Sequence, residues 1–171
     1  MITLHHLEYS QSFRILWLLE ELGAPYELKI YDRDPETRLA PAEYKALSPL
    51  GTAPVITDDT GLVLAESNAV IDYILDSHPE SPLRPAPGDA ARVDYLFWFH
   101  AGVGSLMPMQ FFNGLLTMMK ARSPALVRSV IGIATDKVRE MLVAPRLKVL
   151  FDKLESDLGR HKWLAGDHLT A

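Results

Sequence analysis

The chain has 171 residues, 48% of them apolar and 23% charged, which is typical of a globular protein. A chain of this length buries about 70% of its surface on folding, enough for one domain or two small ones. The net charge of −5 offers no basic surface to phosphates, so no nucleic acid partner is expected. The absence of cysteine excludes disulfides, thiolate metal sites and cysteine nucleophiles, so any sulfur chemistry must use the sulfur of a ligand.

The N-terminal segment 1–6 lacks the basic region and the long apolar run of a signal peptide, which favours a cytoplasmic location. The uncharged stretch 95–119 is long enough to cross a bilayer, but it contains His100, Pro108 and three glycines. This composition favours a buried core helix that breaks near Pro108, and no membrane span is expected.

The first part of the chain alternates between strand and helix patterns. Residues 2–7 predict a strand, and residues 12–22 carry apolar side chains at the helical spacing i, i+3, i+4 and i+7. Gly23 is the expected left-handed cap of that helix. Alternation in residues 26–30 predicts a second strand, and a short helix is expected around 42–47.

A hairpin is expected next, with strands at 54–57 and 62–65 on either side of turn residues. Ser67 is the expected N-cap of a helix that ends before Pro79. The predicted order of these elements is βαβαββα.

Prolines concentrate in residues 79–89, and the sequence beyond them has a helical pattern. We therefore predict an α/β domain over residues 1–78, a proline-rich linker over 79–89 and an all-helical domain over 90–171. The helical domain has expected helices over 90–107 and 126–142, and a third that has Pro145 in its first turn and ends at Gly159.

Four local patterns occur in the order that is typical of the cytosolic glutathione transferases. They are Tyr9-Ser10-Gln11-Ser12-Phe13-Arg14, Ser48-Pro49-Leu50-Gly51-Thr52-Ala53-Pro54-Val55, Glu66-Ser67-Asn68-Ala69-Val70 and Trp163-Leu164-Ala165-Gly166-Asp167-His168-Leu169-Thr170-Ala171. The whole chain resembles this family, and segments 14–19 and 104–108 look most similar to bacterial serine-type members. The resemblance implies a thioredoxin-like α/β N-terminal domain followed by an all-α domain.

The resemblance also implies that glutathione is the co-substrate and that a hydroxyl group activates its thiol. Ser10 lies where the chain leaves the first strand, and the start of the next helix favours an anion. Lowering a thiol pKa from near 8.5 by about two units requires roughly 2.7 kcal/mol, and one charge-assisted hydrogen bond supplies on the order of 1.5–3 kcal/mol. Ser10 is therefore the expected donor to a thiolate, with Tyr9 and Ser12 as alternatives; Ser12 also fits simple helix capping.

The other expected glutathione contacts are Ser12, Thr52, Ala53, Pro54, Val55, Glu66 and Ser67. If the Ala53-Pro54 bond is cis, the Val55 backbone faces the ligand as an antiparallel edge, and a plain strand-entry proline is the alternative. Glu66 and Ser67 at a helix start suit the amino group and the carboxylate of a γ-glutamyl group, and an ordinary N-cap is the alternative.

Two features of the chain depart from the family pattern, and Arg14 is expected to be structural and not catalytic. Thr52 stands where many members carry a lysine for the glycyl carboxylate, so Lys45, Arg38 or Arg33 are the expected substitutes. Arg14 is expected to pair with an acid beneath the first helix. Members normally continue for several more helices, so the helical domain is expected to be incomplete at its C-terminus.

The resemblance places an apolar electrophile between the Ser10 turn and the first helices of the all-α domain. Methionine and aromatic side chains suit such a pocket, with His100, Met107 and Phe111 as the expected nearest residues, although plain core positions also fit this spacing. The histidines lack metal-ligand spacing, so no metal is expected.

These features predict a cytoplasmic detoxification enzyme that transfers glutathione to a small apolar electrophile, with reduction of hydroperoxides as a variant reaction. The alternatives are a non-catalytic glutathione transferase-like binding or regulatory module and a carrier of apolar ligands. A homodimer is implied by the resemblance.

Overall fold

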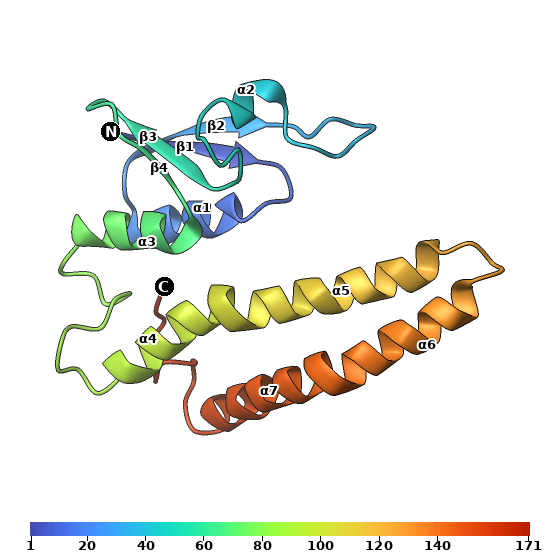
Figure 1. The fold of residues 1–171 in the computed structure, drawn as a ribbon. Coiled ribbons are helices and arrows are strands. Elements are labelled where there is room, and N and C mark those ends of the chain that lie inside the picture. Colours follow the sequence, from blue (N-terminus) through green and yellow to red (C-terminus); the bar gives the residue numbers. More distant parts are fainter. The chain divides into compact units, whose positions relative to one another are not determined.

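The computed structural model describes residues 1–171 and divides into two compact units (Figure 1). One unit comprises residues 1–84 together with Ala171, and the other comprises residues 85–170. The boundary between them falls inside the proline-rich stretch 79–89.

The N-terminal unit is built on a four-stranded mixed sheet with the strand order β2-β1-β3-β4. β1 (Ile2–Leu7) runs parallel to β2 (Tyr26–Tyr31), because a helix connects the two strands. β3 (Val55–Asp58) pairs antiparallel with β1 and with β4 (Val63–Ala65).

Helices α1 (Ser12–Leu22) and α3 (Ser67–Asp76) cover one face of this sheet, and the short helix α2 (Ala42–Lys45) lies on the other (Figure 1). The apolar residues at helical spacing face the sheet, and Ile15 of α1 and Ile74 of α3 are completely buried. Each such side chain contributes about 1.5–3 kcal/mol through burial. The βαβαββα order of the predicted thioredoxin-like domain is confirmed.

The C-terminal end of α1 agrees with the sequence prediction, whereas the N-terminal end of α3 does not. α1 ends at Gly23, which adopts the expected left-handed conformation with φ of 59° and donates its N–H to the Glu20 carbonyl. α3 has Glu66 as its N-cap residue, with φ of 79° and ψ of 124°, and Ser67 is already helical. The predicted cap at Ser67 is therefore wrong, because the chain makes its bend from β4 one residue earlier.

The helical unit consists of two long rods that run antiparallel (Figure 1). The first rod joins α4 (Arg92–Ala101), the π-helical turn η1 (Gly102–Leu106) and α5 (Met107–Arg122), and the second joins α6 (Arg128–Val138), the π-helical turn η2 (Arg139–Val143) and α7 (Ala144–Leu158). Pro108 and Pro145 each lie in the first turn after a π-helical turn. The α-helix is interrupted near Pro108 as expected, but the interruption is a π-helical turn, and the rod continues through it.

The expectation that residues 95–119 form a buried core helix is wrong. Tyr95, Ala101 and Leu116 are the buried residues of this stretch, whereas Phe111 is 74% exposed. Two antiparallel rods cover only one stripe of each other, so many apolar side chains of this stretch stay half-buried or exposed. None of the helices has the length and hydropathy that crossing a bilayer requires.

Two charged networks hold the rods of the helical unit together. In the first, Asp157 of α7 is 2% exposed and accepts hydrogen bonds from Trp98 Nε1 (2.8 Å), Lys153 Nζ (2.8 Å) and Arg160 (2.5 Å). Burial raises the pKa of Asp157, but the three donors outweigh burial and lower this pKa to about 2.

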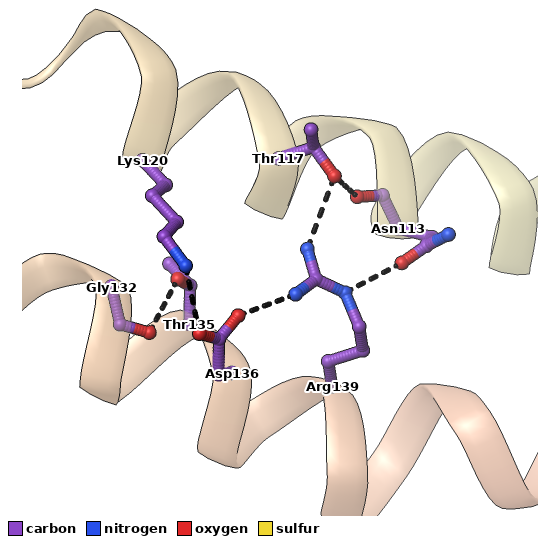
Figure 2. Close-up of polar contacts among 7 residues, drawn as sticks. All are labelled: Asn113, Thr117, Lys120, Gly132, Thr135, Asp136 and Arg139. Carbon is purple, nitrogen blue, oxygen red and sulfur yellow. Dashed lines mark hydrogen bonds and ion pairs between the residues drawn. The ribbon is translucent and has the colours of Figure 1, made fainter.

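The second network connects α5 with α6 and η2 (Figure 2). The guanidinium of Arg139 donates to Asn113 Oδ1 (2.9 Å), to Thr117 Oγ1 (3.1 Å) and to Asp136 Oδ1 (2.6 Å). Lys120 Nζ lies 2.9 Å from the other carboxylate oxygen of Asp136. The hydrogen bond from Lys120 lowers the pKa of Asp136, and Arg139 adds to this effect.

Candidate functional site

The candidate site is built on the turn between β1 and α1, residues 8–11. Tyr9 adopts a positive φ of 49°, and its ring is 78% exposed beneath the guanidinium of Arg38, 5.3 Å from the ring centroid. This bend places Ser10 just before the first turn of α1, half-buried, where main-chain N–H groups lack helical partners.

Two serine hydroxyls and one histidine form a compact network in this turn. Ser10 Oγ donates to the Leu7 carbonyl at 2.6 Å, lies 2.7 Å from Ser12 Oγ and accepts the Ser12 main-chain N–H at 3.2 Å. Ser12 Oγ lies 2.9 Å from His6 Nδ1 and accepts the Leu7 N–H at 3.2 Å. Ser12 is completely buried, so of the two serines only Ser10 has surface for a ligand.

A pocket of about 660 Å³ opens beside this turn. Its wall brings together four of the predicted site residues, namely Tyr9, Ser10, Thr52 and Ala53. Ser12, Pro54, Val55, Glu66 and Ser67 are not part of this wall. The structure therefore gathers residues of the first two sequence patterns on the wall of one pocket.

Two basic side chains, Arg33 and Lys45, lie on the same wall. The Arg33 guanidinium holds the main chain of the turn, because it donates to the carbonyls of Glu8 (2.7 Å) and Tyr9 (3.5 Å). It also donates to the Arg38 carbonyl (3.0 Å). A guanidinium has five N–H donors, so these bonds leave capacity for an anion. Lys45 is exposed, and the pocket therefore carries positive charge although Thr52 supplies none.

Arg14 does not have the partner that the sequence analysis expects. It is exposed on the pocket wall and takes part in none of the ion pairs of the structure. The expected pairing with an acid beneath α1 is therefore wrong, because the side chain points to solvent from the side of α1 that does not face the sheet.

Of the two predictions for the segment that leads into β3, the cis peptide bond is confirmed and the open strand edge at Val55 is not. The Ala53-Pro54 peptide bond is cis, as expected. Val55, however, is completely buried and registers with His5 of β1 on one side and Ala65 of β4 on the other. Val55 is therefore an interior residue of the sheet and not the open edge that the sequence analysis expects.

Glu66 and Ser67 occupy the start of α3. Glu66 is exposed, and Ser67 is buried, 8% exposed. The positive φ of Glu66 turns the chain from β4 into α3 at this point. Both residues lie in the N-terminal unit, but neither contributes to the wall beside Ser10.

The residues predicted for the electrophile belong to the helical unit. His100 is exposed in the last turn of α4, Met107 is half-buried at the start of α5, and Phe111 follows one turn later. Met107 and Phe111 share a helix face because they are four residues apart. A pocket of about 560 Å³ in this unit is lined instead by residues of η1, α5 and α7, among them Ser105, Met109 and Arg146.

The sequence analysis assigns no role to His6, which the structure places in contact with Ser12. The only signal for this contact is strand alternation, which puts His6 on the same face of β1 as Leu4, the face that α1 covers. His5 points to the other face, where its ring nitrogens lie 2.9 Å from Tyr31 Oη and 3.0 Å from Thr57 Oγ1. Burial, together with Lys29, lowers the pKa of His5, so this imidazole is neutral at pH 7.

Comparisons with known proteins agree on one family. A family model for the N-terminal domain of glutathione S-transferase matches residues 10–77. Glutathione S-transferase 3 of Schizosaccharomyces pombe is 33% identical over 172 residues, covering 100% of this chain and 69% of that protein. Glutathione S-transferase 1 of Saccharomyces cerevisiae is 31% identical over 171 residues, covering 94% of this chain and 71% of that protein.

A solved structure leads to the same family. The crystal structure of a glutathione S-transferase from Actinobacillus pleuropneumoniae matches with a TM-score of 0.74 and 37% identity, covering 99% of this chain and 72% of that chain. The sequence similarity and the structural similarity indicate the same family, and the chain belongs to the glutathione S-transferase family.

Proposed function

We propose that the protein is a serine-type glutathione transferase, in which Ser10 stabilises the thiolate of glutathione for attack on a small apolar electrophile. The observation that carries this proposal is the half-buried Ser10 hydroxyl on the wall of the 660 Å³ pocket at the start of α1. The similarity to proteins named glutathione S-transferase supports glutathione as the ligand of this pocket.

Ser10 acts as a hydrogen-bond donor, and the nucleophile is the sulfur of the ligand. A bond to a charged acceptor contributes about 1.5–3 kcal/mol, whereas the neutral bond to the Leu7 carbonyl that it replaces contributes about 0.5–1.5 kcal/mol. The difference of about 1–1.5 kcal/mol lowers a thiol pKa by about one unit. The N-terminus of α1 adds about 0.3–1 kcal/mol, so the thiol pKa falls from near 8.5 to near 7.

The geometry favours Ser10 over both alternative donors. Ser12 has no exposed surface, and its hydroxyl is surrounded by His6, Leu7 and Ser10. The Tyr9 ring is largely exposed and extends toward Arg38, so water solvates its hydroxyl and weakens any bond to a thiolate.

For the other end of the tripeptide we propose Arg33 and Lys45 as the groups that bind the glycyl carboxylate. Both lie on the pocket wall with Thr52, which has no charge to offer. The main chain of Thr52 and Ala53, just before β3, is the proposed partner of the peptide backbone.

For the apolar electrophile we propose His100, Met107 and Phe111 as contacts. In the reaction the thiol proton goes to solvent, a sulfur–carbon bond forms, and the leaving group departs with its electron pair. Reduction of a hydroperoxide is the proposed variant. The same thiolate attacks the peroxide oxygen, the O–O bond breaks and the alcohol leaves, and a second glutathione then attacks the resulting sulfenic acid and releases water and glutathione disulfide. A cytoplasmic homodimer is the proposed form of the enzyme.

A titration of bound glutathione tests the role of Ser10. Thiolate absorbance is followed against pH for the wild type, for Ser10→Ala and for Tyr9→Phe, which removes the neighbouring hydroxyl as a matched control. We expect a thiol pKa near 7 in the wild type, a rise of about one unit in Ser10→Ala and no change in Tyr9→Phe.

Other results of this titration would support different assignments. An unchanged thiol pKa in Ser10→Ala contradicts the assignment, and a rise in Tyr9→Phe transfers the role to Tyr9. A glutathione that binds but keeps its thiol protonated at pH 7 would identify a non-catalytic binding module. No binding at millimolar glutathione, with tight binding of apolar molecules, would identify a carrier.

A further inference from the structure

The protons available in the Ser10 turn determine the direction of its hydrogen bonds. The Leu7 carbonyl can only accept, so its 2.6 Å contact with Ser10 Oγ uses the one Ser10 hydroxyl proton. The Ser12 hydroxyl lies 3.3 Å from the same carbonyl but only 2.7 Å from Ser10 Oγ, and this shorter contact between the two serine oxygens then uses the Ser12 hydroxyl proton. Ser12 has no further proton for its 2.9 Å contact with His6 Nδ1, so this contact requires a proton on Nδ1.

The result is one continuous chain of donors. His6 Nδ1–H donates to Ser12, Ser12 donates to Ser10, and Ser10 donates to the Leu7 carbonyl. Two main-chain N–H groups also donate into this chain at 3.2 Å, from Leu7 to Ser12 Oγ and from Ser12 to Ser10 Oγ. Each hydroxyl therefore accepts two bonds and donates one. Donors that point at a hydroxyl oxygen polarise its O–H group and strengthen the bond that it donates.

We propose that His6, as the Nδ1–H tautomer, is a positioning residue that sets the direction of this chain and strengthens the hydrogen bond from Ser10 to a thiolate in the pocket. This inference rests on the proposed function, because the thiolate is that of glutathione. When Ser10 turns its proton from the Leu7 carbonyl to the sulfur, the bonds from His6 and Ser12 stay in place. His6 is not part of the pocket wall, so it acts through Ser12 and Ser10 and does not touch the ligand.

The pair His6→Leu and His6→Asn tests this role on glutathione-bound protein. Leucine removes the Nδ1–H donor, whereas the asparagine amide places an N–H group close to the position of Nδ1–H. We expect the thiol pKa of bound glutathione, read from thiolate absorbance, to rise by about half a unit in His6→Leu. In His6→Asn it stays within about 0.2 unit of the wild type, because the donor is restored.

Two results would overturn the proposal. One is a thiol pKa in His6→Leu equal to that of the wild type. The other is an equal rise in both variants, since packing around β1 and not the donor would then be the cause.

A second measurement uses the free wild-type protein and does not involve glutathione. The nitrogen chemical shifts of isotopically labelled His6, at a pH where the ring is neutral, report which nitrogen carries the proton. We expect a protonated Nδ1 in the wild type and loss of this preference in Ser12→Ala, whereas an Nε2–H tautomer in the wild type refutes the chain. If Ser10→Ala leaves the thiol pKa unchanged, the proposed function fails while the tautomer result still stands.

Discussion

The Ser10 turn and the charged networks of the helical unit are hydrogen-bonded clusters of similar size that differ in the charge of their members. In the Ser10 turn the partners are hydroxyls, main-chain groups and an imidazole, and the bond lengths run from 2.6 to 3.3 Å. Around Asp157 and Asp136, each cluster contains a carboxylate and two cations. A hydroxyl can turn its proton toward a new acceptor, whereas a buried carboxylate such as Asp157, held by several donors, keeps its geometry. The first arrangement suits ligand chemistry, and the second suits stability.

The largest expected effect on stability comes from Asp157→Asn, which removes the buried charge and keeps the shape of the side chain. The folded-state pKa of Asp157 is about 2, below the usual 3.8, so the charged form stabilises the fold above pH 4. We expect a loss of about 1–2 kcal/mol in the free energy of unfolding at pH 7, allowing for the partly exposed cations. The difference from the wild type should shrink as the pH falls from about 4 to about 2.

Urea denaturation at several pH values measures this difference. Asp152→Asn is the matched control, since Asp152 also lies on α7 and pairs with Lys148 at 2.6 Å, but with both side chains exposed. An exposed pair of this kind contributes about 0.3–0.5 kcal/mol. Equal losses in the two variants, or a loss in Asp157→Asn that does not depend on pH, would show that burial of the charge has no special role.

The second effect concerns Arg139, which bridges the rods at the joint between α6 and α7. Arg139→Met keeps the length of the side chain but removes its donors to Asn113 and Thr117 of α5. We expect a loss of about 1 kcal/mol from these two neutral acceptors, measured by urea denaturation at high salt, where the partly exposed ion pair to Asp136 is weakened by screening. Arg146→Met on α7 is the control, because Arg146 is exposed and forms no ion pair. Equal losses in the two variants would show that the bridge does not hold the rods together.

The parts of the fold that the sequence predicts are those with local causes. The βαβαββα order follows from hydrophobic periodicity and turn residues, and the cap at Gly23 follows from the left-handed backbone that glycine adopts easily. Pro108 shows the limit of such rules. A proline is compatible with a helix break or with a first helical turn, and only the π-helical turn before it decides between them.

As with the fold, only those parts of the candidate site that have local causes could be predicted from the sequence. The turn that carries Ser10 can be located from the order of the first strand and helix, and the pocket wall does contain Tyr9, Ser10, Thr52 and Ala53. The contact of Ser12 with His6 was not predictable, because it depends on how α1 packs on the sheet and not on the spacing of the two residues. The interior position of Val55 likewise depends on strand pairing, which the local pattern does not contain.

The smallest effect is expected from Gly132→Ala, at the edge of the network in Figure 2. Replacing a glycine inside a helix with alanine stabilises the helix by about 0.5–1 kcal/mol. The added Cβ would lie 3.0 Å from Lys120 Cε, so the lysine that pairs with Asp136 must shift by a few tenths of an ångström. Because this ion pair is exposed and the lysine is flexible, we expect the helix effect to dominate and the variant to gain a few tenths of a kcal/mol.

Gly114→Ala in α5 provides the reference for this gain, because a Cβ at Gly114 meets nothing within 4 Å. Urea midpoints of the two variants, compared with the wild type, separate the helix effect from the displacement of Lys120. A clear loss in Gly132→Ala alongside a gain in Gly114→Ala would mean that the Lys120–Asp136 pair is rigid and stabilising despite its exposure. The contrast between a movable neutral network and a fixed charged one would then extend to the surface of the rods, where ion pairs ordinarily contribute little.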